Sequence, residues 1–196
     1  ERLLPWRLST PGPQIAVGDV NGDGIEDCFF GGAPGTPGGL FVQQKNGQFA
    51  RLPDPGQADK VCEDGGSVLF DADGDGDKDL FVTSGGSAAP AGRDEYQPRL
   101  YLNDGTGKFT RAADALPKIT DSGFSVATFD YDSDGDLDLF VGGWCVPGSY
   151  PSPPASHILR NDKGKFTDVT QQVAPAFAYC GMVRGIVFGD VNGDQQ

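Results

Sequence analysis

Short apolar runs recur along this chain, and each is bounded by glycine, proline or acidic residues. They come in pairs that flank an acidic stretch, at residues 14–17 and 28–30, 67–70 and 80–82, and 124–129 and 139–141. Runs this short and rich in valine, leucine and phenylalanine are typical of buried strands, because a helix needs a longer pattern with a period of about 3.6 residues. The pattern therefore predicts pairs of strands joined by acidic loops.

A second pair of apolar runs follows each acidic stretch, within residues 40–49, 100–109 and 158–166. These segments turn at Asn-Gly, Asp-Gly or Lys-Gly dipeptides, which favour tight hairpins because glycine adopts a positive φ at no steric cost. Each repeat is thus expected to form four antiparallel strands, which we number first to fourth in chain order.

The acidic stretches share one motif, with Asp at positions 1, 5 and 9, Asp or Asn at position 3, and Gly at position 6. Complete copies are residues 19–27, 71–79 and 130–138, here called loops 1, 2 and 3, and a partial copy begins at Asp190. A spacing of about 50 to 60 residues fits one blade of a β-propeller. We predict an all-β propeller of four-stranded antiparallel blades, with about three blades and the start of another.

A single propeller region is expected over residues 1–196. Its blades are predicted at approximately residues 13–52, 65–112 and 123–170, with a partial blade over 182–196. Residues 1–12 are expected to form the outer strand of a preceding or closing blade.

The composition of the acidic loops predicts calcium sites. Calcium binds six to eight oxygen ligands, and carboxylates at positions 1, 3 and 5 of a sharp loop converge on one point. Glycine at position 6 permits that turn, and position 7 offers its backbone carbonyl because its side chain varies from Ile25 to Asp77. We predict one Ca²⁺ in each complete loop, at least three in all.

The predicted ligands are the residues at positions 1, 3, 5, 7 and 9 of each copy. They are Asp19, Asn21, Asp23, Ile25 and Asp27 in loop 1; Asp71, Asp73, Asp75, Asp77 and Asp79 in loop 2; Asp130, Asp132, Asp134, Asp136 and Asp138 in loop 3; and Asp190, Asn192 and Asp194 in the partial copy. Gln195 replaces the position 6 glycine, so the fourth site is incomplete as the sequence stands.

Three other interpretations of the acidic loops fit the sequence less well. An EF-hand needs a glutamate at position 12 between two helices, whereas this chain has Phe30, Val82 or Val141 there, between predicted strands. Surface turns without metal would not need the same acidic motif, and the chain has three complete copies of it at the same place in each repeat. Catalytic carboxylate pairs are disfavoured because the aspartates of the motif recur in a loop of each repeat.

The charge of the chain is −13, with 28 acidic against 15 basic residues. More than half of the acidic residues fall in the motif copies, so the negative charge is local and suits bound cations. The balance argues against nucleic acid or an anionic membrane surface as a partner. No apolar run approaches the roughly 18 residues of a membrane-spanning helix, so no membrane insertion is expected.

The loops between second and third strands vary in length and are rich in glycine, proline and serine, at residues 31–38, 84–98 and 142–156. In an up-and-down blade these loops share one face with the connections between blades, while the acidic loops lie on the opposite face. Tyr96, Trp144 and Tyr150 lie in or beside them, where each side chain either contacts a ligand or packs into the rim.

The cysteines and the only histidine give weaker signals. The four cysteines form no C-x-x-C pair, which argues against zinc; Cys28 is expected in the core, and a disulfide between Cys145 and Cys180 is left open. His157 is interpreted as structural, because a lone histidine does not support a catalytic triad.

The acidic motif followed by Leu-Phe-Val-Gly-Gly at residues 139–143 resembles the FG-GAP, or VCBS, repeats of integrin α-subunit-like β-propellers. The hairpin at residues 100–109 is similar to that in the propeller of cartilage acidic protein and its bacterial relatives. This resemblance implies a seven-bladed ring with structural calcium, in an extracellular, cell-surface or periplasmic setting. Three complete motifs are fewer than such a ring needs, so the chain is expected to be a fragment of one.

The leading functional hypothesis is a non-enzymatic binding or adhesion module, in which calcium stiffens the blades and the opposite loops meet a protein or glycan. One alternative is an accessory propeller of a carbohydrate-active enzyme such as a polysaccharide lyase. Another is a purely structural domain of a larger surface protein. Because a fold does not determine function, these alternatives stay open at this point.

Overall fold

The computed structural model describes residues 12–190, which form three four-stranded antiparallel sheets. The first contains β1 (Ile15–Gly18), β2 (Asp27–Phe30), β3 (Gly39–Gln43) and β4 (Phe49–Leu52). The second contains β5 (Asp64–Phe70), β6 (Asp79–Ser84), β7 (Arg99–Asn103) and β8 (Phe109–Arg111). The third contains β9 (Gly123–Phe129), β10 (Asp138–Gly143), β11 (His157–Asp162) and β12 (Lys165–Asp168). The all-β prediction is confirmed.

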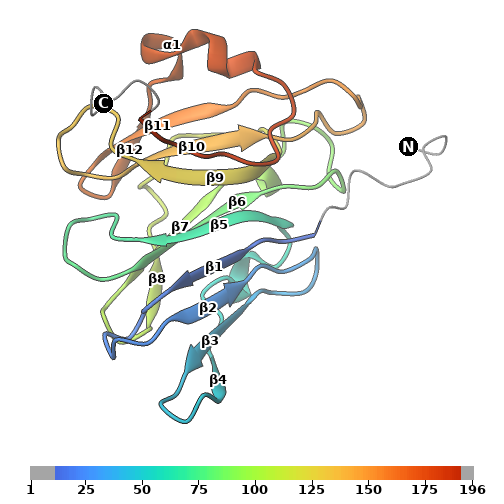
Figure 1. Ribbon diagram of the computed structural model, residues 1–196. Helices are drawn as coiled ribbons and strands as arrows, with labels where there is room; N and C mark the ends of the chain where they lie inside the picture. The colour runs from blue at the N-terminus through green and yellow to red at the C-terminus, as the bar shows by residue number, and fades with distance from the viewer. Residues whose placement is uncertain (1–11, 191–196) are drawn as a thin grey trace.

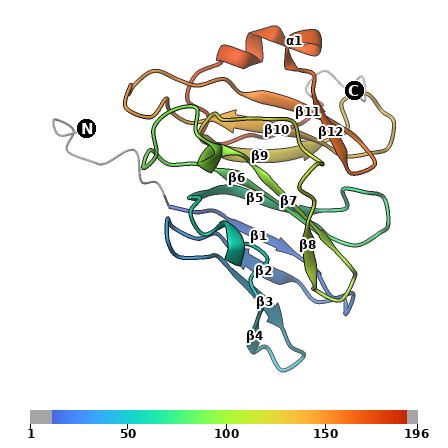
Figure 2. The ribbon, with the colours of Figure 1, turned by 180° about the vertical axis from the view of Figure 1, so that it is seen from behind.

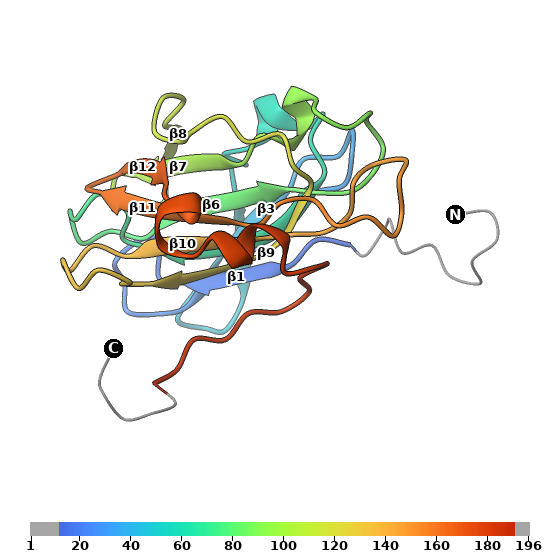
Figure 3. The same ribbon diagram turned by 90° about the horizontal axis from the view of Figure 1, so that it is seen from above.

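Within each sheet the strands are hydrogen-bonded in chain order, as in a blade of a β-propeller. The three blades stack in the order of the sequence (Figures 1 and 2). The first strands are neighbours, since β5 contacts both β1 and β9. Seen from above, β1 and β9 lie on one side of the stack and β8 and β12 on the other (Figure 3). The chain thus contains three successive propeller blades.

Apolar side chains fill the two junctions between blades. Between the first and second blades, Leu40 and Leu80 are completely buried. Between the second and third, Leu139 is completely buried and the rings of Phe70 and Phe166 meet edge to face, 6.4 Å apart. Each such leucine contributes about 1.5–3 kcal/mol through its burial.

Helical structure among the described residues is short. It consists of one turn of α-helix, α1 (Thr170–Val173), and the 3₁₀ segments η1 (Gln57–Asp59), η2 (Asp94–Tyr96) and η3 (Pro175–Tyr179). No helix in this part of the chain is long and apolar enough to cross a membrane.

The two faces of the stack carry different loops. The loops after β1, β5 and β9 contain the acidic motifs and point to the left in Figure 1, whereas those after β6 and β10 point to the right. We call these sides the acidic-loop face and the long-loop face. The long-loop face also carries the connections between blades.

Three details differ from the sequence predictions or lie beyond the described residues. No strand forms within residues 182–190, where a partial blade was predicted, although the backbone N–H of Val183 donates to the carbonyl of Gly143 at 2.8 Å. Residues 1–11 and 191–196 lie outside the described part of the chain. The outer strand predicted over residues 1–12 is therefore described only at Gly12. Cys28 is only partly buried, because no preceding blade covers its face among the described residues as one covers Leu80.

All four cysteines lie within the described residues, and no disulfide joins Cys145 to Cys180. Cys145 is buried beside Phe124 and Trp144, whereas Cys180 is exposed and its thiol lies 3.6 Å from the hydroxyl of Ser156. The disulfide that the sequence left open is therefore not part of this structure.

Candidate metal centres

Each acidic loop joins the first and second strands of its blade. Position 6 has a positive φ in every complete copy: 81° at Gly24, 96° at Gly76 and 94° at Gly135. Glycine adopts this left-handed conformation without strain, so the turn predicted from the sequence is confirmed.

Position 4 is also left-handed, which the sequence analysis did not anticipate. Gly22 and Gly74 have φ values of 71° and 82°, and Ser133 occupies the same conformation in loop 3 with a φ of 61°. A residue with a β-carbon is disfavoured there, so loop 3 carries a local strain that the other two loops avoid.

The aspartate at position 1 organises the backbone of its own loop. In loop 1, Asp19 accepts hydrogen bonds from four backbone N–H groups, including that of Gly24 at 2.7 Å. Burial would raise the pKa of Asp19, but these bonds lower it below the ordinary value. In loops 2 and 3, Asp71 and Asp130 likewise accept from the position 6 glycine, at 3.0 and 3.1 Å.

The aspartate at position 9 is completely buried and links its loop to the third strand of the same blade. The two oxygens of Asp79 accept hydrogen bonds of 2.8 Å from the backbone N–H groups of Ala72 and Asn103. Asp27 and Asp138 make the same pair of bonds in loops 1 and 3. Burial raises the pKa of Asp79 to about 6, although both hydrogen bonds lower it.

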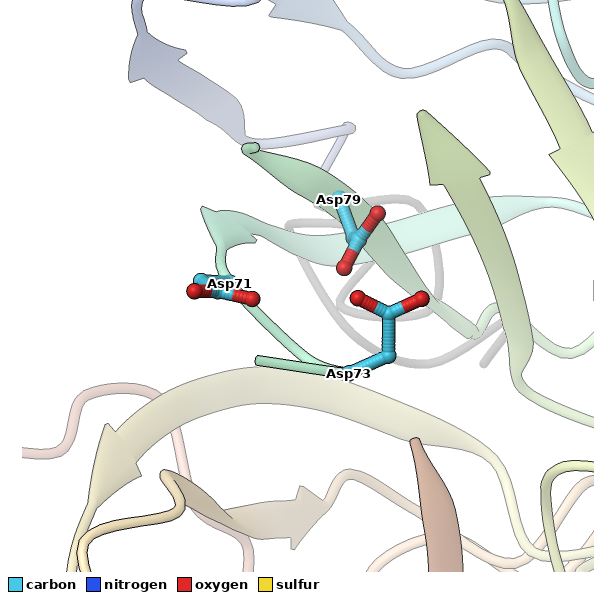
Figure 4. Close-up of side chains that lie close together, drawn as sticks. All are labelled: Asp71, Asp73 and Asp79. Atoms are coloured by element: carbon cyan, nitrogen blue, oxygen red, sulfur yellow. The ribbon is translucent and has the colours of Figure 1, made fainter. Parts of the chain in front are cut away.

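Two loops bring three carboxylates together. One oxygen from each of Asp71, Asp73 and Asp79 lies within 4.8 Å of the others, and Asp130, Asp132 and Asp138 form the equivalent group in loop 3. Figure 4 shows the carboxylates of Asp73 and Asp79 facing one another, with Asp71 beside them. Burial and the charge of Asp75 raise the pKa of Asp73. Oxygen ligands at this spacing, with no histidine or thiol among them, fit a hard cation such as Ca²⁺.

These loops match a known family. A model of the FG-GAP-like repeat matches residues 19–82 and 71–141, which together make up more than half of the 196-residue chain. The chain belongs to the FG-GAP-like repeat family. Each FG-GAP match begins at position 1 of one acidic loop and ends in the second strand of the following blade. No curated protein matches the chain.

The remaining predicted ligands of the FG-GAP loops lie outside the carboxylate groups. At position 5, one oxygen of Asp75 accepts a hydrogen bond of 2.9 Å from the N–H of Asp77, and Asp23 and Asp134 make the same local bond. Loop 1 forms no group of three carboxylates, because its position 3 is Asn21.

The last predicted ligands are the residues at position 7 and those of the partial fourth copy. The carboxylate of Asp136 accepts from the N–H of Lys163 at 3.2 Å, so this side chain contacts the hairpin turn of its own blade. Ile25 has no side-chain oxygen, which leaves the backbone carbonyl as the oxygen that position 7 offers in every loop. Asp190 is exposed at the end of the described residues, and Asn192 and Asp194 lie outside them.

Two asparagines that the sequence analysis missed connect successive FG-GAP repeats. Asn103 ends β7, and its side-chain N–H₂ donates to the carbonyl of Val20 in loop 1 at 2.8 Å. Asn161 in β11 makes the same bond to Ala72 in loop 2, also at 2.8 Å. Both acceptors occupy position 2, so loops 1 and 2 are each tied to the next blade. The partners lie more than 80 residues apart, which hid this contact from local pattern.

The contacts of His157 fit the structural role that was expected from the sequence. Its ring nitrogens lie 2.8 Å from an oxygen of Asp168 and 3.2 Å from an oxygen of Asp121. Burial would lower the pKa of His157, but these hydrogen bonds and charges raise it to about 9. The protonated ring thus joins the third blade to the segment that enters it.

The aromatic residues of the long-loop face divide between packing and exposure. Tyr96 is buried, with its hydroxyl donating to the carbonyl of Ala89 at 2.5 Å, and Trp144 is buried against Phe124. Tyr150 remains 36 % exposed. The packing interpretation therefore holds for Tyr96 and Trp144.

Proposed function

We propose that this chain is a calcium-binding, non-catalytic binding module that meets a protein or glycan on its long-loop face. The observation that carries the proposal is the convergence of positions 1, 3 and 9 on one point in both loop 2 and loop 3. Three carboxylates held together repel one another, and a divalent cation removes that repulsion while adding stability wherever it binds only the folded chain.

Calcium suits these sites better than magnesium or zinc. The side chains at positions 1, 3 and 9 provide oxygen only, and a flexible loop with varied oxygens accommodates the six to eight ligands of calcium. Magnesium demands near-ideal octahedral geometry, and zinc prefers nitrogen and sulfur. In loop 2 we assign Asp71, Asp73 and Asp79 as ligands, with the carbonyl of Asp77 completing the protein contribution.

Loop 1 belongs to the same proposal with one change of ligand. Asn21 supplies an amide oxygen in place of the position 3 carboxylate, and amide oxygens are accepted calcium ligands. Because the amide carries no charge, we expect this site to bind calcium more weakly than loops 2 and 3.

A binding role on the long-loop face is supported by how the loops are distributed. On the acidic-loop face, the position 1 aspartates accept hydrogen bonds from the backbone of their own loops. The long-loop face instead carries irregular segments that vary between blades. We place the module in an extracellular or periplasmic setting, where calcium sites of moderate affinity are filled. Nucleic acid is not a proposed partner because the net charge is −13.

The experiment that tests the metal role compares single-site variants in thermal melts with calcium, with magnesium and with chelator. Asp73→Ala removes a ligand that makes few structural contacts, so we expect an almost unchanged melting temperature in chelator and a smaller rise with calcium. The control is Asp114→Asn, which removes one exposed carboxylate outside the acidic loops. An equal response to calcium in both variants would contradict the assignment.

A further inference from the structure

Glu63 and Ser122 occupy the same place in successive blades. The carbonyl of Glu63 accepts a hydrogen bond of 2.8 Å from the N–H of Gly85, and the carbonyl of Ser122 accepts one of 2.8 Å from Trp144. Both bonds lie on the long-loop face, just beyond the paired ends of the first and second strands. Gly85 in the second blade is therefore the structural counterpart of Trp144 in the third.

The position shared by Gly85 and Trp144 is filled differently in the two blades. Trp144 is 3 % exposed, and its ring lies 5.3 Å from the ring of Phe124. The guanidinium of Arg184 lies over the indole, 4.9 Å from its centroid. In the second blade a glycine replaces that bulk. A cavity of about 340 Å³ lies there, between the first and second blades.

The walls of this cavity combine five apolar side chains with two carboxylates, those of Glu63 and Glu95. The apolar lining comes from three loops of the long-loop face and consists of Pro34, Val61, Ala88, Ala89 and Pro90. Glu63 and the ring of Tyr96 also line it, while Arg93 and Glu95 form an ion pair of 3.4 Å with each other.

The carboxylate of Glu63 is partly buried and accepts no hydrogen bond from the described residues. A β-carbon on Gly86 would stand 1.8 Å from one of its oxygens, so the absence of a side chain at Gly86 makes room for it. Arg99, the one buried lysine or arginine among the described residues, is already paired with Asp64 at 2.6 Å. Burial, and then the charge of Asp64, raise the pKa of Glu63.

We propose that this cavity binds an organic ammonium group on an apolar stem, such as the side chain of a lysine in a protein partner, with Glu63 as its counter-ion. This assignment rests on the proposed role of the long-loop face in ligand binding. An ammonium donates up to three hydrogen bonds and supplies the positive charge that the carboxylate lacks. Methylene groups of the stem match the apolar walls.

Other ligand classes fit this cavity less well. An anion would meet Glu63 and Glu95 in a chain of net charge −13. A calcium ion needs six to eight oxygens, and only two carboxylates line the cavity, one of which is paired with Arg93. A neutral apolar ligand would leave the partly buried carboxylate without compensation.

The test measures binding of Nα-acetyl-lysine amide by amide chemical shifts in calcium-loaded protein, with Nα-acetyl-norleucine amide as the uncharged probe of similar shape. We expect the lysine probe to shift the amides of Gly85, Gly86 and Ala89, and the norleucine probe to bind at least about tenfold more weakly. Glu63→Gln should weaken the lysine probe by a similar factor.

Two further variants separate the effect of the Glu63 charge on probe binding from the effect of the shape of the cavity. Ala88→Leu narrows the cavity while Glu63 is kept, so it should also weaken the lysine probe. Asp114→Asn, which removes an exposed charge elsewhere, should leave binding unchanged. Equal binding of the two probes, or unchanged binding in Glu63→Gln, would overturn the inference.

Calcium-dependent melting of the same samples separates this inference from the proposed metal role. A chain that is stabilised by calcium but does not bind the lysine probe contradicts the cavity assignment alone. A chain that binds the probe without any response to calcium contradicts the metal role alone.

Discussion

The side-chain amide of Asn161 donates a hydrogen bond of 2.8 Å to the carbonyl oxygen of Ala72, which lies in the acidic loop of the preceding blade. The N–H of the same Ala72 donates to Asp79, a proposed calcium ligand. The N–H and the carbonyl of Ala72 therefore connect the candidate metal centre of one blade to the third strand of the next.

This connection predicts that the junction between blades and the metal centre depend on each other. We expect Asn161→Ala to destabilise the chain by about 1–3 kcal/mol, because it leaves buried backbone groups without partners. It should also weaken calcium binding at loop 2, although Asn161 is not a ligand. Denaturant unfolding and calcium titration measure the two effects, with the exposed Asn46→Ala as the control. Unchanged calcium affinity in a folded Asn161→Ala variant would contradict the coupling.

The buried aspartate at position 9 is predicted to have a structural role that does not require metal. Asp79→Asn places an amide N–H₂ against a backbone N–H of Ala72 or Asn103, because both carboxylate oxygens are acceptors. We expect a loss of about 1–3 kcal/mol in chelator. Asp73→Asn should cost much less under the same conditions, since Asn21 already occupies that position in loop 1. Equal losses in the two variants would show that position 9 has no special structural role.

The left-handed conformation of Ser133 predicts a stabilising substitution. Ser133→Gly matches Gly22 and Gly74 at position 4 and should raise the stability of the chain by about 1 kcal/mol. The reverse change, Gly74→Ala, should lower it by a similar amount. Thermal melts of both variants, with and without calcium, check the prediction, which fails if the two changes act in the same direction.

The pKa of His157 predicts a loss of stability in mild alkali. The folded pKa is about 9 and the ordinary value is 6.5, so the contribution to stability is complete below pH 6.5 and is lost as pH rises through 9. Its partner Asp168 has a pKa of about 2, because hydrogen bonds from His157 and Thr170 outweigh the opposing effect of burial. The contribution of Asp168 is therefore lost only as pH falls from about 4 towards 2.

We expect His157→Gln to flatten the pH dependence of the free energy of unfolding between pH 6.5 and 9. The effect should be on the order of 1–2 kcal/mol, because Asp121 and Asp168 are partly exposed to solvent. His157 is the only histidine in the chain, so subtraction of the variant curve from the wild-type curve isolates it. Parallel curves would mean that the ring is neutral in the folded chain.

The sequence predicted those features that depend on local pattern. Short apolar runs and turn residues located the strands, and the positive φ of Gly76 followed from its place in the motif. The strand expected before Asp190 does not form among the described residues, because a strand needs a partner to complete its hydrogen bonds. Cys28 is more exposed than predicted because burial at its position depends on a neighbouring blade.

Contacts between blades were beyond the reach of the sequence pattern. In the sequence, Asn161 is one polar residue near a hairpin turn. Its partner Ala72 lies 89 residues away, so no local pattern predicts the contact. The same holds for the cavity beside Glu63, which becomes visible only when Gly85 and Trp144 are aligned through their hydrogen bonds.

Calcium titration by calorimetry is the most direct test of the central claim that the acidic loops are metal centres. We expect about three ions per chain, with loops 2 and 3 filled before loop 1, and a melting temperature that rises as they fill. Binding that is absent, or equally strong with magnesium and insensitive to Asp73→Ala, would contradict it.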